Sequence, residues 1–232
     1  MGIPKIGITL GDPGGIGPEV AFKSLLQCEE LESICPIIFG PSSLLAHGKL
    51  TPIVRQLNVI QLTDLASLDG SPNRDAAVYF LETEDLPPLG PEGKDDGANG
   101  HIAYQSIVHA AALAGEGSLD GLVTAPISKT SFKLGGIKDS GHTSLLQRLT
   151  GAHDVSMAFF TPALKVVLAT IHIPLAEVPA ALDEETLCRA IRNGRDFVRA
   201  LGITNPRIAV AGLNPHAGEG GLFGHEESTV LA

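Results

Sequence analysis

Two apolar runs that each lead to a histidine most constrain the fold of this chain. Residues 207–211 form a short apolar run typical of a buried strand, which passes directly into the glycine-rich stretch 212–221 carrying His216. Residues 165–171 have the same character and end at His172. If the two strands are parallel neighbours, both imidazoles lie at the carboxyl edge of one sheet, where open α/β sheets bind their ligands.

The two histidines are candidate ligands for a divalent metal. Neutral imidazole binds Zn, Co, Ni or Fe well, but catalytic metal sites usually take three protein ligands. The third ligand would come from Glu219, from another segment or from another chain. The alternative for His216 is a capped loop in which the imidazole is only hydrogen-bonded.

The N-terminal residues predict a strand, a turn and a helix. The strand covers 5–10, the turn covers 11–19, and the helix continues to about Gln27. The turn is rich in glycine, but its glycines do not have the GxGxxG spacing of a dinucleotide site, and no GxxxxGK[ST] motif occurs. A tight turn that brings the helix onto the sheet is therefore favoured over phosphate binding.

Further strands and helix starts are expected along the chain. Strands are predicted at 36–39, 54–60, 76–81 and 120–124, and a hairpin at 155–171 indicates at least one antiparallel strand. Residues 85–100 form the clearest loop. Helices are expected to begin at Pro41, Asn99, Gly141 and Asp183.

Two positions could meet an anion. Lys129 follows a predicted strand, and His142 with Thr143 begins a helix whose free N–H groups suit a phosphate or carboxylate. Alternatively, Lys129 is a plain solvated lysine and His142–Thr143 is a helix cap with a polar neighbour. His101 and His109 are expected on the surface of their helix.

Composition narrows the classes of partner and compartment. The net charge of −10 and the lack of a basic run argue against nucleic acid. No apolar run approaches membrane-spanning length, and no signal peptide is expected. The three cysteines are odd in number and form no CxxC pair, which indicates a reducing cytoplasm.

Five motifs together resemble the PdxA family of 4-hydroxythreonine-4-phosphate dehydrogenases. They are GDPGGIGPE at 11–19, TAPISK at 124–129, GHT at 141–143, ATIHIP at 169–174 and GLNPHAGEGG at 212–221. The resemblance implies an α/β/α architecture like that of isocitrate and isopropylmalate dehydrogenases, with a mixed sheet and an active site in a cleft. The chain is expected to be one incomplete region over 1–232 that could be organised in two lobes, and to form a homodimer.

The resemblance also implies an activity and site residues. The reaction is oxidation of the C3 hydroxyl of 4-phosphonooxy-L-threonine by NAD or NADP, followed by decarboxylation, in pyridoxal 5′-phosphate (vitamin B6) biosynthesis. His172 and His216 correspond to ligands of a divalent metal (Zn, Co or Mg), and His142 and Thr143 correspond to substrate contacts. The resemblance assigns no catalytic residue within these motifs.

The chain departs from the family after Ala232. The resemblance implies a further C-terminal segment with a third metal-binding histidine and much of the cofactor site, so the 232-residue chain is expected to be truncated and weakly active or inactive. Two alternatives stay open. One is a non-catalytic α/β module that binds a small phosphorylated acid or a metal, and the other is a family relative that acts on another hydroxy acid or a diol.

Overall fold

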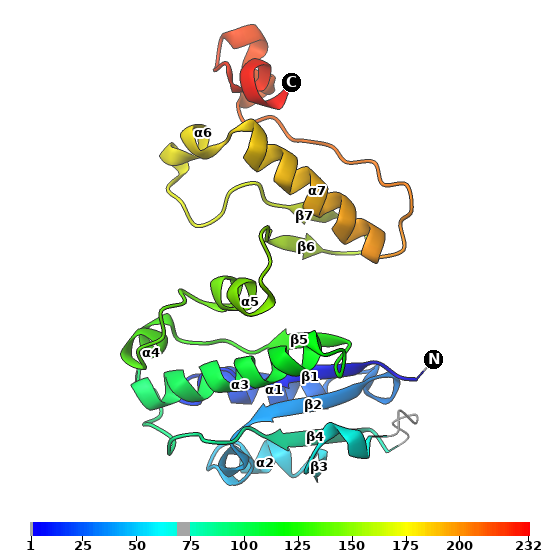
Figure 1. The fold of residues 1–232 in the computed structure, drawn as a ribbon, viewed down its shortest axis with the longest axis vertical. Coiled ribbons are helices and arrows are strands. Elements are labelled where there is room, and N and C mark those ends of the chain that lie inside the picture. Colours follow the sequence, from blue (N-terminus) through cyan, green and yellow to red (C-terminus); the bar gives the residue numbers. More distant parts are fainter. Residues whose placement is uncertain (1, 69–74) are drawn as a thin grey trace. The chain divides into compact units, whose positions relative to one another are not determined.

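A five-stranded parallel sheet organises the N-terminal part of the chain in the computed structural model (Figure 1). The spatial order of the strands is β3-β4-β2-β1-β5. They are β1 (Lys5–Thr9), β2 (Cys35–Gly40), β3 (Asn58–Leu62), β4 (Ala77–Glu82) and β5 (Gly121–Thr124). The central strand β2 is buried at every position, as expected for a parallel strand covered on both faces. The structure describes residues 2–68 and 75–232.

Helices lie on both faces of this sheet. Ile38 and Phe39 are adjacent in β2 and therefore point to opposite faces. Ile38 packs in one core cluster with Phe22 of α1, and Phe39 packs in another with Ala110 of α3. The sheet is thus the middle layer of an α/β/α arrangement. The helices here are α1 (Gly17–Leu26), α2 (Thr51–Val54), α3 (Gly97–Gly115), α4 (Lys129–Leu134) and α5 (His142–Thr150), with 3₁₀ turns η1 (Leu31–Ser33), η2 (Ser42–Ala46) and η3 (Leu65–Ser67).

The chain divides into two compact units, Met1–Gly151 and Ala152–Ala232. In the second unit, β6 (Ala158–Phe160) pairs with β7 (Lys165–Val167) in an antiparallel ladder. The other elements are η4 (Leu175–Glu177), α6 (Val178–Ala181), α7 (Glu184–Ala200), η5 (Pro215–Gly221) and η6 (Glu227–Leu231). Across the described residues of both units, no helix is long and apolar enough to cross a bilayer.

The α/β class predicted from the sequence is confirmed. The predicted strands at 5–10, 36–39, 76–81 and 120–124 appear as β1, β2, β4 and β5, and the hairpin appears as β6–β7. The antiparallel pair forms a sheet of its own, so the five-stranded sheet is entirely parallel instead of mixed. Asp183 caps α7 as expected, because its carboxylate accepts a hydrogen bond of 2.8 Å from the backbone N–H of Thr186.

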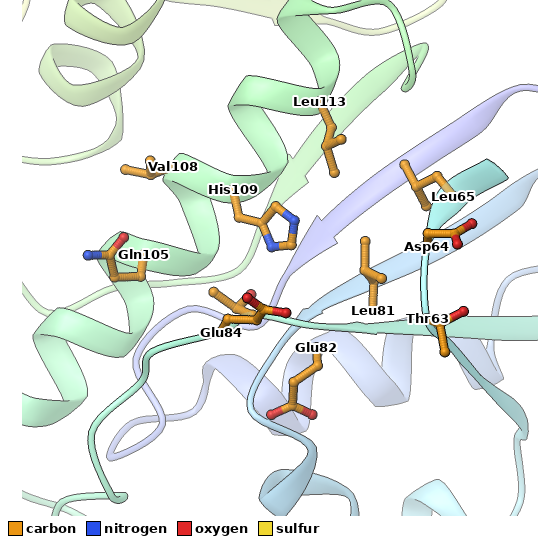
Figure 2. Close-up of a pocket in the computed structure, with 11 residues that line it drawn as sticks. Thr63, Asp64, Leu65, Leu81, Glu82, Glu84, Gln105, Val108, His109 and Leu113 are labelled. Carbon is orange, nitrogen blue, oxygen red and sulfur yellow. The ribbon is translucent and has the colours of Figure 1, made fainter.

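Three predictions in the first unit need correction. The predicted strand at 54–60 begins as helix α2, whose Val54 packs against the core, and β3 starts only at Asn58. Helix α3 is capped by Asp96, whose carboxylate accepts from the backbone of Ala98 and Asn99, so Asn99 lies inside the first turn. His109 is half-buried and projects from α3 toward the sheet (Figure 2), with its ring edge-on to Phe39 at 5.2 Å between centroids.

The predicted strand at 207–211 is wrong. These residues are exposed and have no strand geometry. A strand is stable only when its backbone groups pair with a neighbour, and the described residues provide no strand that pairs with this run. The apolar composition of the run therefore does not by itself produce a strand.

Two glycines of α3 allow a direct test of helix packing. A Cβ on Gly100 would lie 2.1 Å from the carbonyl oxygen of Ser131 in α4, whereas a Cβ on Gly115 would have nothing within 4 Å. We expect Gly100→Ala to lower the free energy of unfolding by about 1–3 kcal/mol, because the two helix backbones must separate. Gly115→Ala should be neutral or stabilising by up to about 1 kcal/mol, since alanine favours helix. Urea unfolding of both variants measures the difference, and equal free energies for the two would contradict the packing argument.

Candidate functional site

The carboxyl ends of β1 and β5 bring together two of the five predicted motifs, those at 11–19 and 124–129. The two strands are parallel neighbours, with Thr9 opposite Thr124. Beyond them the backbone N–H of Ala125 donates to the carbonyl of Thr9 at 3.0 Å, and the N–H of Asp12 donates to the carbonyl of Pro126 at 3.0 Å. The chain leaves β1 toward β2 on one side, while β5 lies on the other. Such a switch point is where open α/β sheets bind ligands.

The glycine-rich turn after β1 is shaped by close packing. Gly11 has a left-handed φ of 72°, and a Cβ there would lie 2.1 Å from the Pro126 carbonyl oxygen. A Cβ on Gly17 would lie 2.4 Å from the Leu10 oxygen. The Asp12 carboxylate accepts from the N–H of Gly14 at 2.7 Å and closes the turn. These contacts support the interpretation of this segment as a tight turn that brings α1 onto the sheet.

A third loop joins the same edge, and the sequence did not indicate its role. The N–H of Gly93 donates to the carbonyl of Gly14 at 2.7 Å. The Ser128 hydroxyl donates to the carboxylate of Asp95 and accepts from the N–H of Ser131, which caps α4. Buried Asn99 accepts from the N–H of Gly90 at 2.9 Å. A serine directly before a helix is a recognisable cap signal, but only the tertiary structure shows that its hydroxyl bonds to Asp95.

Lys129, His142 and Thr143 are brought together at the start of α5. The Cε atom of exposed Lys129 lies 3.6 Å from the place where a Cβ on Gly141 would be. His142 is the first residue of α5, and Thr143 beside it is exposed. The N-cap of α5, Gly141, supplies no side-chain hydrogen bond to the first N–H groups. A cation next to free helix N–H groups is an arrangement that binds anions.

The His142 imidazole has an unused nitrogen. Its Nε2 atom is buried, and no group in the described parts of the chain forms a hydrogen bond with it. Burial lowers the pKa of His142, so the ring is neutral at pH 7. An unsatisfied buried polar atom is costly, and a bound ligand with a matching donor or acceptor would remove that cost.

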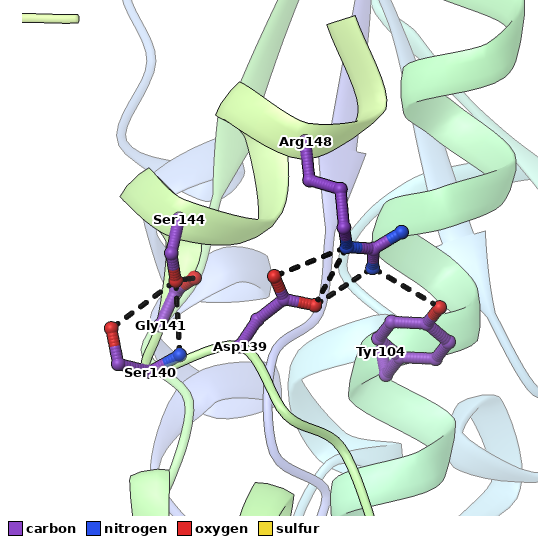
Figure 3. A network of polar contacts seen from close by, with 6 residues as sticks. All are labelled: Tyr104, Asp139, Ser140, Gly141, Ser144 and Arg148. Carbon is purple, nitrogen blue, oxygen red and sulfur yellow. Dashed lines mark hydrogen bonds and ion pairs between the residues drawn. The ribbon is translucent and has the colours of Figure 1, made fainter. Parts of the chain in front are cut away.

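A polar network holds the segment that precedes α5 (Figure 3). The Arg148 guanidinium contacts both carboxylate oxygens of Asp139, at 2.7 Å from Nη2 and 3.2 Å from Nε, and reaches the Tyr104 hydroxyl of α3 at 3.4 Å. The Ser140 N–H donates to the Ser144 hydroxyl at 2.9 Å. Asp139 is 10% exposed, so this bidentate pair is better shielded from water than a typical surface ion pair. It fixes the start of α5 against α3.

The predicted metal ligands His172 and His216 belong to the second unit. β7 ends at Val167 and pairs antiparallel with β6, and 207–211 is not a strand. The proposed pair of parallel strands delivering both imidazoles to one edge is therefore wrong. Both histidines are exposed and have left-handed backbone angles, with φ of 58° and 54°. Their role as metal ligands depends on the family motifs alone.

Donor chemistry decides whether these residues could hold a metal. Among the described residues, no group of three or more His, Cys, Asp or Glu side chains is placed to bind one. The carboxylates of Glu226 and Glu227, which follow His216 in the sequence, already have another partner, because both accept from Asn214. The described residues do not form a complete divalent metal centre, and the two imidazoles would supply only part of one.

Comparison with known proteins identifies the family. The model of the family described as pyridoxal phosphate biosynthetic protein PdxA matches residues 32–232. The chain belongs to this family. It is 38% identical over 227 residues to 4-hydroxythreonine-4-phosphate dehydrogenase of Beijerinckia indica, covering 97% of this chain and 65% of the relative. It is 36% identical to D-threonate 4-phosphate dehydrogenase of Cupriavidus necator, covering 97% and 66%.

Solved structures of the family have the same fold. The crystal structure of 4-hydroxythreonine-4-phosphate dehydrogenase from Klebsiella pneumoniae superposes with a TM-score of 0.83 at 32% identity, over 100% of this chain and 69% of that one. The chain spans just under two thirds of the length of the Beijerinckia and Cupriavidus relatives.

Burial of two histidines predicts a pH dependence of stability. Burial lowers the pKa of His142 and of His109, and for His109 the nearby Glu84 carboxylate opposes part of that effect. The unfolded chain binds these protons near pH 6.5 and the folded chain only at lower pH. Stability from the neutral rings is thus fully present above about pH 6.5 and is lost as pH falls toward the lowered pKa values.

We expect the free energy of unfolding, measured by urea titration, to decrease between about pH 7 and pH 5. His109→Asn and His142→Asn should each flatten this decrease, and the slopes of variant and wild type should coincide above about pH 7.5. If both variants kept the wild-type slope of the free energy of unfolding against pH, the assignment of this slope to His109 and His142 would be contradicted.

Proposed function

We propose that this chain forms the substrate-binding part of an NAD(P)- and divalent-metal-dependent dehydrogenase in pyridoxal 5′-phosphate biosynthesis. The reaction is oxidation of 4-phosphonooxy-L-threonine at C3, followed by loss of CO2. Family membership supports the reaction class. The single structural observation behind the proposal is the unpartnered, buried Nε2 of His142 beside Lys129 at the start of α5.

The side chains at the start of α5 suit an acidic substrate. Lys129 supplies a positive charge, and the first N–H groups of α5 supply hydrogen-bond donors directed at the same anion. The neutral His142 ring and the Thr143 hydroxyl can each bond a substrate oxygen. We assign these residues to holding the phosphate or carboxylate of the substrate, so that its reacting carbon is fixed in place.

A nicotinamide cofactor would supply the hydride acceptor for the oxidation at C3. We assign His172 and His216 as two ligands of the divalent metal (Zn, Co or Mg), the remaining ligands coming from another segment or from a second copy in a homodimer. This assignment rests on the family motifs at 169–174 and 212–221. Free Cys28, Cys35 and Cys188 support a reducing, cytoplasmic location.

A second candidate substrate has a specific observation in its favour. The Cupriavidus relative is named as a D-threonate 4-phosphate dehydrogenase, and its identity to this chain is close to that of the Beijerinckia relative. Another phosphorylated hydroxy acid would use the same anion contacts. A non-catalytic module that binds such an acid would keep these contacts but form no NADH.

Substrate binding tests the proposed anion site. Titration calorimetry of the 232-residue polypeptide with 4-phosphonooxy-L-threonine should show binding that Lys129→Ala and His142→Ala each weaken by about tenfold, since a charge-assisted hydrogen bond is lost. Lys133→Ala, on the same helix α4 and also exposed, is the matched control and should bind as wild type. D-Threonate 4-phosphate, titrated in parallel, ranks the two substrates. Equal affinity of the Lys129→Ala and Lys133→Ala variants for 4-phosphonooxy-L-threonine would contradict the proposed anion site.

Metal binding and turnover test the proposed ligands. We expect the 232-residue polypeptide to bind Zn or Co weakly and to lose the metal on gel filtration, because two imidazoles do not complete a catalytic site. His172→Ala or His216→Ala should abolish the remaining binding, whereas His47→Ala should not. NADH formation from either substrate should stay below about 1 s⁻¹. Tight stoichiometric binding would show that Glu219 or a neighbouring chain completes the site.

A further inference from the structure

A cavity of about 460 Å³ lies beside the carboxyl ends of β3 and β4 (Figure 2). In the sheet, β2 separates β4 from β1 and β5. Residues from β4 and the segment after it, from the segment after β3, and from α3 line it. Neither the family motifs nor the proposed anion site includes these residues. The cavity therefore calls for a separate explanation.

The charged side chains among the described residues of the cavity wall are carboxylates. Asp64, Glu82 and Glu84 line the cavity, and the described part of the lining includes no lysine or arginine. Both oxygens of Glu82 already accept from the backbone N–H of Ser42, at 3.0 Å each. Glu84 is exposed and lies close enough to His109 to act on its charge. A concave surface of one sign concentrates ions of the opposite sign.

His109 does not balance this charge. Burial lowers the pKa of the ring, so the imidazole is neutral at pH 7 and adds a polar nitrogen instead of a positive charge. The neutral ring thus leaves the negative charge of the nearby Glu84 carboxylate in place.

Thr83 independently points to a missing ligand. The residue is 5% exposed and lines the same cavity. Its Oγ1 atom is buried and has no hydrogen-bond partner in the described parts of the chain. A buried hydroxyl of this kind requires a partner, and the neighbouring carboxylates make a positively charged donor the best match.

The lining favours an organic cation over a metal ion. No group of three or more His, Cys, Asp or Glu side chains among the described residues is placed to bind a metal. Leu65, Leu81, Val108 and Leu113 also line the cavity and offer apolar surface. An ammonium group donates up to three hydrogen bonds and carries an alkyl chain that such surface can contact.

We propose that this cavity binds a primary alkylammonium group, with Glu84 as its counter-ion and the Thr83 hydroxyl as an acceptor. The four apolar side chains contact the alkyl portion of the ligand. This site is separate from the proposed substrate site and does not depend on the proposed dehydrogenase function.

Titration by NMR tests the site on the ¹⁵N-labelled 232-residue chain. Butylammonium chloride should give saturable shifts of the Thr83, Glu84 and His109 amides, and butan-1-ol, which has the same alkyl chain without the charge, should not. Glu84→Gln and Thr83→Val should each weaken binding by about tenfold. Thr83→Ser keeps the hydroxyl and should bind as wild type. Glu116→Gln, an exposed carboxylate outside the cavity, is the control for general electrostatic attraction.

Three results would overturn the proposal. They are equal shifts with butan-1-ol, an equal effect of Glu84→Gln and Glu116→Gln, and the absence of saturable shifts at the three amides. The spectra of the unliganded variants show directly whether each is folded. The NMR titration contains neither a phosphate compound nor a nicotinamide cofactor, so its result does not depend on the outcome of the test of the anion site.

Discussion

The close backbone approach between the loops after β1 and β5 brings the motifs at 11–19 and 124–129 together in the N-terminal unit. Hydrogen bonds from Ala125 to Thr9 and from Asp12 to Pro126 extend the contact between the two strands past their ends. The approach is feasible because Gly11 has no side chain where a Cβ would lie 2.1 Å from the Pro126 oxygen. Lys129 comes directly after Ser128, the N-cap of α4, and close to Pro126 in the sequence. The contact at Pro126 therefore also determines where Lys129 lies.

The helices that carry Lys129 and His142 are held by the same kind of constraint. Gly100 lets α3 approach the backbone of α4, and Arg148 ties the segment before α5 to Tyr104 of α3 through Asp139. The side chains of Lys129 and His142, which are distant from β1 in the sequence, thereby lie together beside the free N–H groups of α5. Because burial keeps His142 neutral, the positive charge at this place comes from Lys129 and the helix end.

Sequence reasoning was most accurate where local pattern and tertiary packing agree. The strands β1, β2, β4 and β5 are apolar runs bounded by turn residues; β2 and most of β1 and β4 are buried, whereas β5 is only partly buried. It was wrong at 207–211, where the apolar pattern is present but no strand among the described residues pairs with it. It was also wrong about His109, because the alanine-rich sequence of α3 does not reveal which of its side chains meets Phe39. The cap of α3 was misplaced because Asp96 and Asn99 are both good capping residues.

The sequence by itself determined the α/β class, most strand positions, and the family motifs that single out His142, Thr143, His172 and His216, because these depend on local residue order. Only the tertiary structure showed that Lys129 lies beside the start of α5 and that Nε2 of His142 is buried without a partner. It also showed that Glu84 and Thr83 share a cavity with His109 of α3. These relations join residues from separate elements, and their burial and distances arise only when the helices pack against the sheet.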